Sequence, residues 1–299
     1  MEASLAELKI AALENRTVLT LRGADVWSFL QNLVTNDMQD VSETHGIYAA
    51  LLTAQGKFLH DFIIVRIGEA YLLDCLADRK DDLIRRLTLY KLRADVLISE
   101  EGQRVFALFG NDAFGAANLP ETSGALRESG GCAFLVDPRN NALGVRLFAP
   151  TSFDPVTEFP TADLVGEDAY DAHRLSLGIP EGGHDILPEK NFLLEANFEE
   201  LNGVSFTKGC YVGQELTART KHRAKIKKRL FRIEYDGELH SGDKIMHQGR
   251  EIAEVRSISN GRGLALVRLN SLAVPPEELE PKGVKLIQPN YIDLPLGDP

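Results

Sequence analysis

The spacing of apolar residues changes near Lys225. Before that position, stretches that alternate apolar and polar residues take turns with stretches of helical spacing. From Arg229 onward, only short alternating stretches separated by glycine-containing turns remain, such as RLFRIEYDG and GLALVRL. Because this periodicity is the main sequence signal of secondary structure, it predicts an α+β domain over residues 1–224 and a small β-barrel domain over residues 225–299.

The first hundred residues show the alternation in detail. RTVLTLRG indicates a strand, ADVWSFLQNLV a helix, and GIYAALLTAQGKFLHDFIIVRI two strands joined by a turn at residues 55–57. The strand AYLLDCLA, the amphipathic helix ADRKDDLIRRLTLYKL and the strands ADVLIS and RVFALFG follow. This order predicts ferredoxin-like units. Residues 1–16 are acidic and helix-prone, and a later helix, EDAYDAHRLSLG, is expected to stop at Gly178.

Composition and charge narrow the possible functions. The 299-residue chain is 44% hydrophobic, but its longest apolar runs are far too short to span a bilayer. A formal net charge of −11 argues against general nucleic-acid binding. The N-terminus lacks the features of a signal or transit peptide, and three cysteines suit a reducing compartment. We therefore expect a cytoplasmic monomer without membrane or nucleic-acid partners.

One stretch is strongly basic, although the chain as a whole is acidic. Residues 216–233 contain no acid, whereas the remainder of the chain is strongly acidic. Two explanations of this stretch remain open from the sequence. It is either a solvated helix face followed by a linker, or a local positive patch that binds an anionic ligand or an acidic partner. Its eight cations are Arg219, Lys221, Arg223, Lys225, Lys227, Lys228, Arg229 and Arg232.

Several binding and catalytic motifs are absent. The chain has no GxxxxGK[ST] phosphate loop, no GxSxG nucleophile elbow and no CxxC pair. His240 and His247 lie near a turn, but no cysteine stands close enough in sequence to complete a zinc set. These absences argue against nucleotide, serine-hydrolase and zinc sites, and we expect no metal site.

The stretch FTKGCYVGQELTART, residues 206–220, departs from ordinary core sequence. Its cysteine, Cys210, lies just before a helix-prone segment and two residues after Lys208. The partial positive charge of a helix start and a nearby ammonium both favour the thiolate form of a cysteine. The other two cysteines, Cys75 and Cys132, lie inside apolar strand patterns and are expected to be buried packing residues.

The two glycines of the stretch suit a functional loop. Gly209 and Gly213 permit tight backbone geometry and the close approach of a ligand. The alternative is an ordinary helix start with a buried thiol, where Gln214 and Glu215 satisfy backbone donors. Spacing alone leaves both interpretations open.

KGCYVGQE resembles the signature of the YgfZ/Iba57 family, relatives of the glycine-cleavage aminomethyltransferases (T-proteins). GADVWSFLQNLVTND is similar to the opening segment of that family, and YAALLTAQGKFLHDFII resembles the segment that carries the catalytic aspartate of the aminomethyltransferases. HRLSLGIPEGGHDILPEKNFLLEANFEELNG is similar to the Iba57 branch, and IAEVRSISNGRGLALVRL resembles the terminal barrel. The resemblance covers the whole chain, and KGCYVGQE is its most specific motif.

The resemblance implies an aminomethyltransferase-like folate-binding fold around a central cavity, closed by a C-terminal β-barrel. It implies tetrahydrofolate or a one-carbon derivative as cofactor, and iron–sulfur assembly or client proteins as partners in the assembly or repair of [4Fe-4S] proteins. Cys210 would be the reactive or cluster-contacting residue, and Lys208 would hold its thiolate or a folate carboxylate. Asp61 would be the acid/base residue of a transfer reaction. The remaining residues implied to line the cofactor pocket are Asn36, Asp37, Tyr170, Ser176, Asn197, Gly209, Tyr211, Gly213, Gln214 and Glu215.

Two positions depart from the aminomethyltransferase pattern. His60 precedes Asp61 where those enzymes have paired acids, and Ser176 stands where they have a pterin-binding glutamate. Because a hydroxyl cannot give the charge-assisted contact of a carboxylate, these residues favour a folate-binding iron–sulfur factor over a tetrahydrofolate-dependent aminomethyltransferase or one-carbon transferase. A catalytically silent scaffold that docks an acidic partner through its basic stretch is a third possibility, which the fold alone does not separate from the others.

Overall fold

The structure, a computed structural model, describes residues 7–223 and 226–294. The chain divides into two compact units. The first comprises residues 1–51, 60–170 and 202–212, and the second comprises residues 52–59, 171–201 and 213–299. The domain boundary expected between residues 224 and 225 lies outside the described residues, so it stays a prediction.

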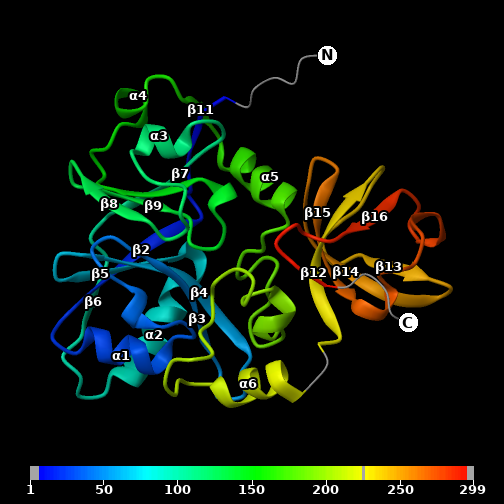
Figure 1. Cartoon of the computed structure of the whole chain (residues 1–299), viewed down its shortest axis with the longest axis horizontal. Helices are drawn as coiled ribbons and strands as arrows, with labels where there is room; N and C mark the ends of the chain where they lie inside the picture. Colours follow the sequence, from blue (N-terminus) through cyan, green and yellow to red (C-terminus); the bar gives the residue numbers. More distant parts are fainter. Residues whose placement is uncertain (1–6, 224–225, 295–299) are drawn as a thin grey trace. The chain divides into compact units, whose positions relative to one another are not determined.

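A five-stranded sheet with the strand order β3-β4-β5-β2-β6 forms one half of the first unit. Helices α1 (Val26–Leu33) and α2 (Lys80–Lys91) connect its strands (Figure 1), and the apolar stripe that predicted α1 is buried in the structure. The predicted turn at residues 55–57 joins β3 to β4, with Gly56 at a φ of 71°. The strands are β2 (Arg16–Arg22), β3 (Ile47–Leu52), β4 (Phe58–Ile67), β5 (Ala70–Leu76) and β6 (Leu97–Ser99).

A six-stranded sheet with the order β11-β1-β7-β10-β9-β8 forms the other half. Phe106, Phe134 and Leu147 belong to its buried apolar core. Two short helices, α3 (Ala113–Ala117) and α4 (Pro155–Glu158), belong to this half. Its strands are β1 (Lys9–Ala12), β7 (Arg104–Phe109), β8 (Leu126–Ser129), β9 (Cys132–Val136), β10 (Val145–Ala149) and β11 (Asp163–Val165).

Strand β1 corrects the helix-prone interpretation of the N-terminal segment. Ile10 pairs with Leu108 of β7 on one side and with Leu164 of β11 on the other. Pairing on both edges and burial of Ile10 outweigh the weak helix propensity of the local sequence. The remainder of residues 1–16 falls partly outside the described residues.

Two longer helices follow, α5 (Glu167–Leu177) and α6 (Gln214–Arg223). Helix α5 ends as predicted at Gly178, whose φ of 77° is the left-handed conformation that glycine adopts without a steric penalty. The 3₁₀ turns are η1 (Met38–Asp40), η2 (Ala77–Arg79), η3 (Asn141–Leu143), η4 (Leu193–Ala196), η5 (Leu269–Ser271) and η6 (Pro276–Glu278).

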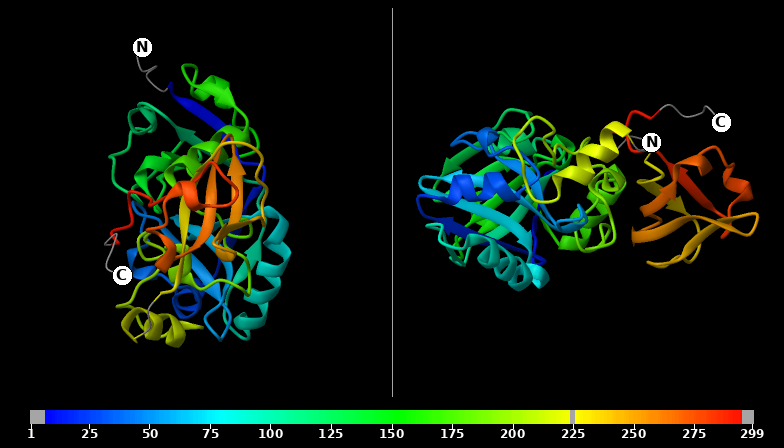
Figure 2. Two further views of the ribbon diagram at one scale, coloured as in Figure 1. Left: turned by 90° about the vertical axis from the view of Figure 1, so that its right-hand side faces the viewer. Right: turned by 90° about the horizontal axis from the view of Figure 1, so that it is seen from below.

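The C-terminal part of the second unit is a curled five-stranded antiparallel sheet with the order β13-β14-β15-β12-β16 (Figure 2). Phe231, Val255 and Val267 belong to the apolar core that it encloses. The prediction of a small barrel after Arg229 is therefore confirmed. Its strands are β12 (Lys228–Tyr235), β13 (Lys244–His247), β14 (Arg250–Ser259), β15 (Arg262–Arg268) and β16 (Val284–Ile287).

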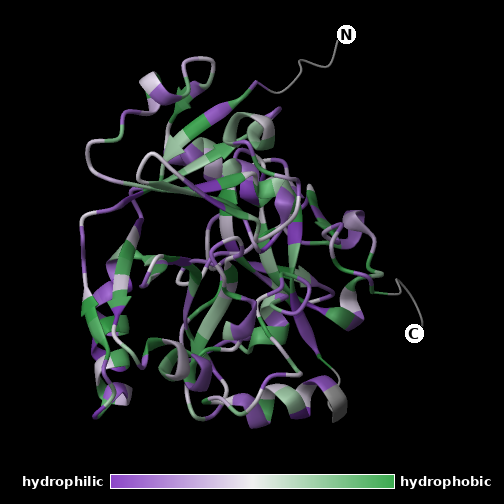
Figure 3. Ribbon diagram, turned by 60° about the vertical axis from the view of Figure 1, so that its left-hand side comes forward, coloured by the Kyte–Doolittle hydropathy of each residue, from purple (hydrophilic) through white to green (hydrophobic). Residues whose placement is uncertain are grey.

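Hydrophobic residues are concentrated in the strands, and hydrophilic residues are frequent in the loops and helices (Figure 3). Strands β3 and β5 are buried along their whole length. Within residues 7–223 and 226–294, no helix combines the length and apolarity that a membrane crossing requires.

Candidate functional site

The cysteine motif begins in a loop that is hydrogen-bonded to the segment after helix α1. The Thr35 hydroxyl donates to the carbonyl of Gly203 at 2.7 Å, and the backbone N–H of Ser205 donates to the carbonyl of Thr35 at 3.0 Å. The Asn36 side-chain amide donates to the carbonyl of Asn202 at 2.7 Å. These bonds bring the opening segment, with its predicted residues Asn36 and Asp37, beside the motif loop.

Lys208 lies inside this junction. Its Nζ donates to the carbonyl oxygens of Val34 and Asn36, each at 2.7 Å, and the residue is 7% exposed. Burial lowers the pKa of Lys208 to about 8, although the charge of Asp37 acts in the opposite direction. Within the described part of the chain, no hydrogen bond joins Lys208 to Cys210, so the ammonium is held by carbonyls rather than by the thiol.

The three cysteines differ in exposure. Cys210 is exposed, whereas Cys75 and Cys132 are buried as the sequence predicts. Burial raises the pKa of the Cys75 thiol to about 12 and also raises that of Cys132. Because a thiol reacts through its accessible thiolate, Cys210 is the cysteine that a reagent, an iron atom or a partner can reach.

Asp61 lies on β4 next to β3 and is 4% exposed. The hydroxyl of Tyr48 donates to its Oδ2 at 2.8 Å. Burial and the neighbouring Asp61 charge raise the pKa of Tyr48 well above its ordinary value. The carbonyl of Tyr48 accepts from the Asn36 side chain at 2.8 Å, so Asp61, Tyr48 and Asn36 form a connected polar group.

A buried network of arginines and aspartates lies in the same unit. Arg146 on β10 places Nη1 3.3 Å from Asp74 and Nη2 3.3 Å from Asp137. Arg16 binds Asp74 at 2.7 Å, and Arg139 binds Asp137 at 2.7 Å. Burial raises the pKa of Asp137, but Arg139 and Arg146 offset this and leave it below its usual value. Each aspartate is paired with two of the three guanidinium groups, and this pairing matters because an unpaired buried charge is costly.

Tyr170 belongs to this network. Its hydroxyl accepts hydrogen bonds from Arg139 at 3.3 Å and from Arg146 at 3.2 Å. Its ring packs edge-on against Phe109 with a centroid separation of 5.5 Å, and the residue is 5% exposed. The resemblance implied that Tyr170 lines the cofactor pocket, and its observed contacts are those of a core residue. The arginines were missed, although an arginine within the apolar strand GVRLFAP was a signal that could have found them.

Of the other predicted pocket residues, Gly209 and Tyr211 lie in the first unit and the rest lie in the second. Tyr211 is 7% exposed, and its ring centroid is 5.1 Å from Lys208 Nζ. The Ser176 hydroxyl donates to the carbonyl of His173 at 2.6 Å, within its own helix. The Asn197 side chain donates to the carbonyl of Leu230 at 2.9 Å and fixes η4 to barrel strand β12. Gln214 and Glu215 begin α6.

The two motif glycines occupy different environments. Gly213 has a φ of 82°, and a β-carbon there would lie 2.5 Å from the carbonyl oxygen of Thr53. A β-carbon on Gly209 would meet nothing within 4 Å. Gly213 is therefore required by the backbone, whereas Gly209 leaves open space beside Cys210.

Three cations of the basic stretch have carboxylate partners in the second unit. Lys221 pairs with Glu199, and Arg229 pairs with Glu200 at 2.6 Å. Arg232 pairs with Glu234 at 3.4 Å. The side chains of residues 222–225 lie outside the described residues. Ion pairs of this kind are typical of a structural segment, and they neutralise part of the positive charge that an anionic ligand or acidic partner would need.

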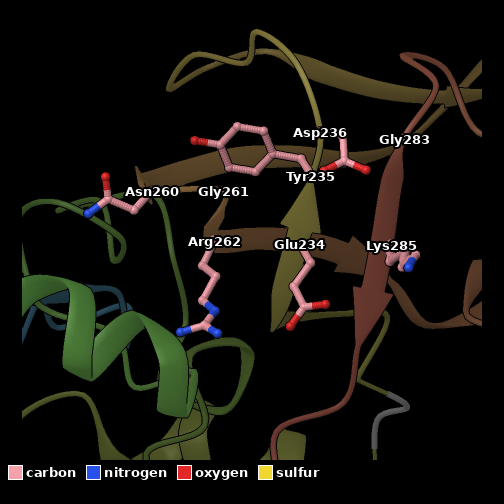
Figure 4. A pocket seen from close by; sticks show the side chains of 8 residues that line it. All are labelled: Glu234, Tyr235, Asp236, Asn260, Gly261, Arg262, Gly283 and Lys285. Carbon is pink, nitrogen blue, oxygen red and sulfur yellow. The ribbon is translucent and has the colours of Figure 1, made fainter. Parts of the chain in front are cut away.

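The barrel carries a cavity of about 480 Å³ that the sequence did not predict (Figure 4). The Arg262 and Glu234 side chains extend from neighbouring strands, and Tyr235 lies at the end of β12. The cavity combines two acids with two bases and so has no net charge. Its lining residues are Glu234, Tyr235, Asp236, Asn260, Gly261, Arg262, Gly283 and Lys285. No group of three or more His, Cys, Asp or Glu residues within the described ranges could hold a metal ion.

Comparison with known proteins gives the family. A family model described as the CAF17 C-terminal beta-barrel domain matches residues 227–291. The human iron–sulfur cluster assembly factor IBA57, mitochondrial, is 34% identical over 278 residues, which cover 85% of this chain and 76% of that protein. The chain belongs to the IBA57 family. The resemblance inferred from KGCYVGQE is thereby confirmed.

Other IBA57 relatives agree in sequence but differ in length. The mouse protein is 32% identical over 88% of this chain and 78% of its own length. The Neurospora crassa homolog is 34% identical over 74% of this chain, and the match spans only 52% of that relative, about half its length. The glycine cleavage system aminomethyltransferase T from Bartonella henselae has a TM-score of 0.79 at 16% identity, covering 96% of this chain and 87% of that chain. This confirms the aminomethyltransferase-like fold.

The expected cytoplasmic location is wrong. The human, mouse and Neurospora crassa IBA57 proteins are all named as mitochondrial, which points to a mitochondrial rather than a cytoplasmic location. The expectation rested on the absence of targeting features at the N-terminus and on the cysteine count. Free cysteines indicate reducing conditions but do not identify the compartment, and an absent pattern is weak evidence.

Proposed function

We propose that this protein supports the assembly or repair of [4Fe-4S] proteins, binds a folate, and uses the Cys210 thiol as its reacting group. The observation that carries the proposal is the exposed thiol of Cys210 within the motif loop of an IBA57-family chain, in contrast to the two buried cysteines. The IBA57 relatives are named as iron–sulfur cluster assembly factors. An accessible thiol is the ligand type that iron–sulfur clusters use.

The number of thiols at the site limits how the protein can bind a cluster. A [4Fe-4S] cluster is held by four cysteine thiolates, whereas Cys210 belongs to no group of three or more His, Cys, Asp or Glu residues that could hold a metal among the described residues. The protein therefore acts on iron or a cluster whose other ligands come from another molecule. Client or assembly proteins carrying the cluster are the expected partners.

Three polar residues of the first unit are suited to hold the pterin ring of a folate. Asp37 accepts hydrogen bonds from Gln31 and Gln39, each at 3.0 Å, and a carboxylate has acceptor sites for about four, so it retains capacity for the N–H groups of a pterin. Asp37 and the buried Asp61 would hold the ring. Asn36 would orient them, because its own amide is engaged by Tyr48 and Asn202. When bound, tetrahydrofolate supplies a one-carbon carrier.

Aminomethyl transfer from a carrier protein is the alternative, and the site argues against it. The serine at the position of the pterin-binding glutamate, Ser176, has its hydroxyl bonded to its own helix. Without a carboxylate there, the charge-assisted contact to a pterin is missing. His60, at the position of an acid, is buried and bonded to Asp82 at 2.8 Å. The chain thus lacks two of the acids that this reaction uses.

The role in cluster assembly is tested in cells that lack the protein. We expect the activity of a [4Fe-4S] enzyme to fall while that of an iron-free enzyme is unchanged, and we expect restoration of the gene to reverse the loss. Equal [4Fe-4S] enzyme activity with and without the protein contradicts the proposal.

Folate binding is tested separately by calorimetry on the purified protein. We expect tetrahydrofolate to bind in the micromolar range, about −8 kcal/mol, and we expect Asp37→Asn to weaken it. A glycine-cleavage assay with the purified carrier protein should give no turnover. The absence of heat with tetrahydrofolate and its methylene and formyl forms removes the folate part, and turnover in the assay favours the alternative.

A further inference from the structure

Five hydrogen bonds join residues 34–36 to residues 202–208. We call this set the clasp; it unites segments that are more than 160 positions apart in the sequence. Two of the bonds come from the ammonium of Lys208. The others are Thr35 to Gly203, Asn36 to Asn202 and Ser205 to Thr35. The clasp ends two residues before Cys210.

Lys208 is the charged member of the clasp. Val34 is the C-terminal cap of α1, so the ammonium lies at the end of a helix where partial negative charge favours a cation. Hydrogen bonds from a charged donor are roughly twice as strong as neutral ones. Burial lowers the pKa of Lys208, and the charge of Asp37 acts in the opposite direction. The other three hydrogen bonds of the clasp have neutral donors, so Lys208 contributes more to the clasp than any other residue.

We propose that Lys208 is a positioning residue whose ammonium fastens the motif loop to the end of α1 and thereby presents Cys210. The inference deepens the proposed function, on which the importance of Cys210 rests. It replaces the expectation that Lys208 holds the thiolate. The observed partners of the ammonium are two carbonyls, and the open space at Gly209 leaves the thiol accessible.

The clasp also connects the motif loop to the predicted folate-lining residues. The Asn36 amide donates both to Asn202 in the loop and to Tyr48, whose hydroxyl binds Asp61. Asn36 therefore belongs to the loop junction and to the Asp61 group at once. Removing the hydrogen bonds of the Asn36 side chain should therefore make the motif loop more mobile, as removing those of Lys208 should, but to a smaller extent.

The test compares Lys208→Met, which keeps an unbranched side chain one atom shorter and removes its donors, with Lys57→Met. Lys57 donates to the carbonyl of Lys190 at 2.7 Å in the second unit, so it is a matched lysine–carbonyl contact outside the clasp. Hydrogen exchange of residues 202–212 and the alkylation rate of Cys210 are measured on the full chain. Neither readout requires cluster assembly, so the result is independent of the proposed function.

We expect exchange in residues 202–212 to rise about tenfold or more in Lys208→Met, because charged hydrogen bonds to two carbonyls are lost. Lys57→Met should leave that segment unchanged. The alkylation rate of Cys210 should stay level or rise. A fall in alkylation with unchanged exchange would identify Lys208 as the thiolate partner and overturn the proposal.

Asn36→Ala provides a second test that applies even if Lys208→Met does not fold. It removes the two amide bonds but keeps the carbonyl that Lys208 uses. We expect a smaller rise in exchange confined to residues 202–212. Wild-type exchange in this segment, in a variant that folds, would mean that the clasp does not hold the loop and would likewise overturn the proposal.

Discussion

Gly213 lies so close to Thr53 that a β-carbon on the glycine would stand 2.5 Å from the Thr53 carbonyl oxygen. The same β-carbon would lie 2.9 Å from Cβ of Leu52. With a φ of 82°, the position combines a crowded backbone with the left-handed conformation. One glycine of the cysteine motif is therefore required by the fold rather than by chemistry.

We predict that Gly213→Ala lowers the free energy of unfolding by roughly 2 to 4 kcal/mol, from backbone strain and overpacking together. Gly209→Ala is the matched control within the same motif. Because a β-carbon on Gly209 meets nothing, its cost should stay within about 0.5 kcal/mol. Urea unfolding of both variants checks the prediction, and equal losses would contradict it.

The buried arginine network gives a second stability prediction. Arg146→Met removes the cation between Asp74 and Asp137 and leaves each with one arginine partner. Breaking a buried ion pair on one side costs several kcal/mol, and we expect about 3 kcal/mol here. Arg104 stands beside β10 in the same sheet but pairs with Glu14 at the surface, so Arg104→Met should cost no more than about 1 kcal/mol.

Thermal and urea unfolding of both arginine variants provide the measurement. A loss in Arg146→Met no greater than that in Arg104→Met would show that the network does not stabilise the first unit.

His60 gives a prediction for pH. Burial lowers its pKa in the folded protein, and the Asp82 contact offsets only part of this effect. The unfolded chain therefore takes up a proton near pH 6.5 that the folded protein does not. Stability should fall as the pH drops below about 6.5, down to the lower folded pKa.

Unfolding free energies of wild type and His60→Gln between pH 5 and 8 isolate this contribution, because most other titrating groups are common to both. We expect the wild type to lose stability relative to the variant as the pH falls. Parallel curves would exclude a lowered pKa for His60.

The sequence predicted most elements because their local pattern and tertiary role agree. The stripe of α1 and the stop of α5 at Gly178 are local signals that the structure keeps. Strand β1 was missed because its assignment depends on pairing with β7 and β11, which are distant in sequence. The local residues alone favoured a helix there.

The candidate site was predictable in its residue types but not in its contacts. Cys210 was singled out by its motif, and its exposure agrees with a reactive thiol. The partners of Lys208 are carbonyls more than 170 positions earlier, and no spacing rule connects them. The Arg146 network likewise arises from strands of two sheets, so an alternation pattern treats its arginines as outward-facing.

The measurement that tests the central claim most directly is the activity of a [4Fe-4S] enzyme in cells whose only copy of this protein carries Cys210→Ser. Protein level and melting temperature are measured on the same variant, and Cys132→Ser serves as the control at a buried cysteine. We predict that Cys210→Ser folds with nearly unchanged stability and fails to support the enzyme, while folded Cys132→Ser supports it. Full support by Cys210→Ser would contradict the account.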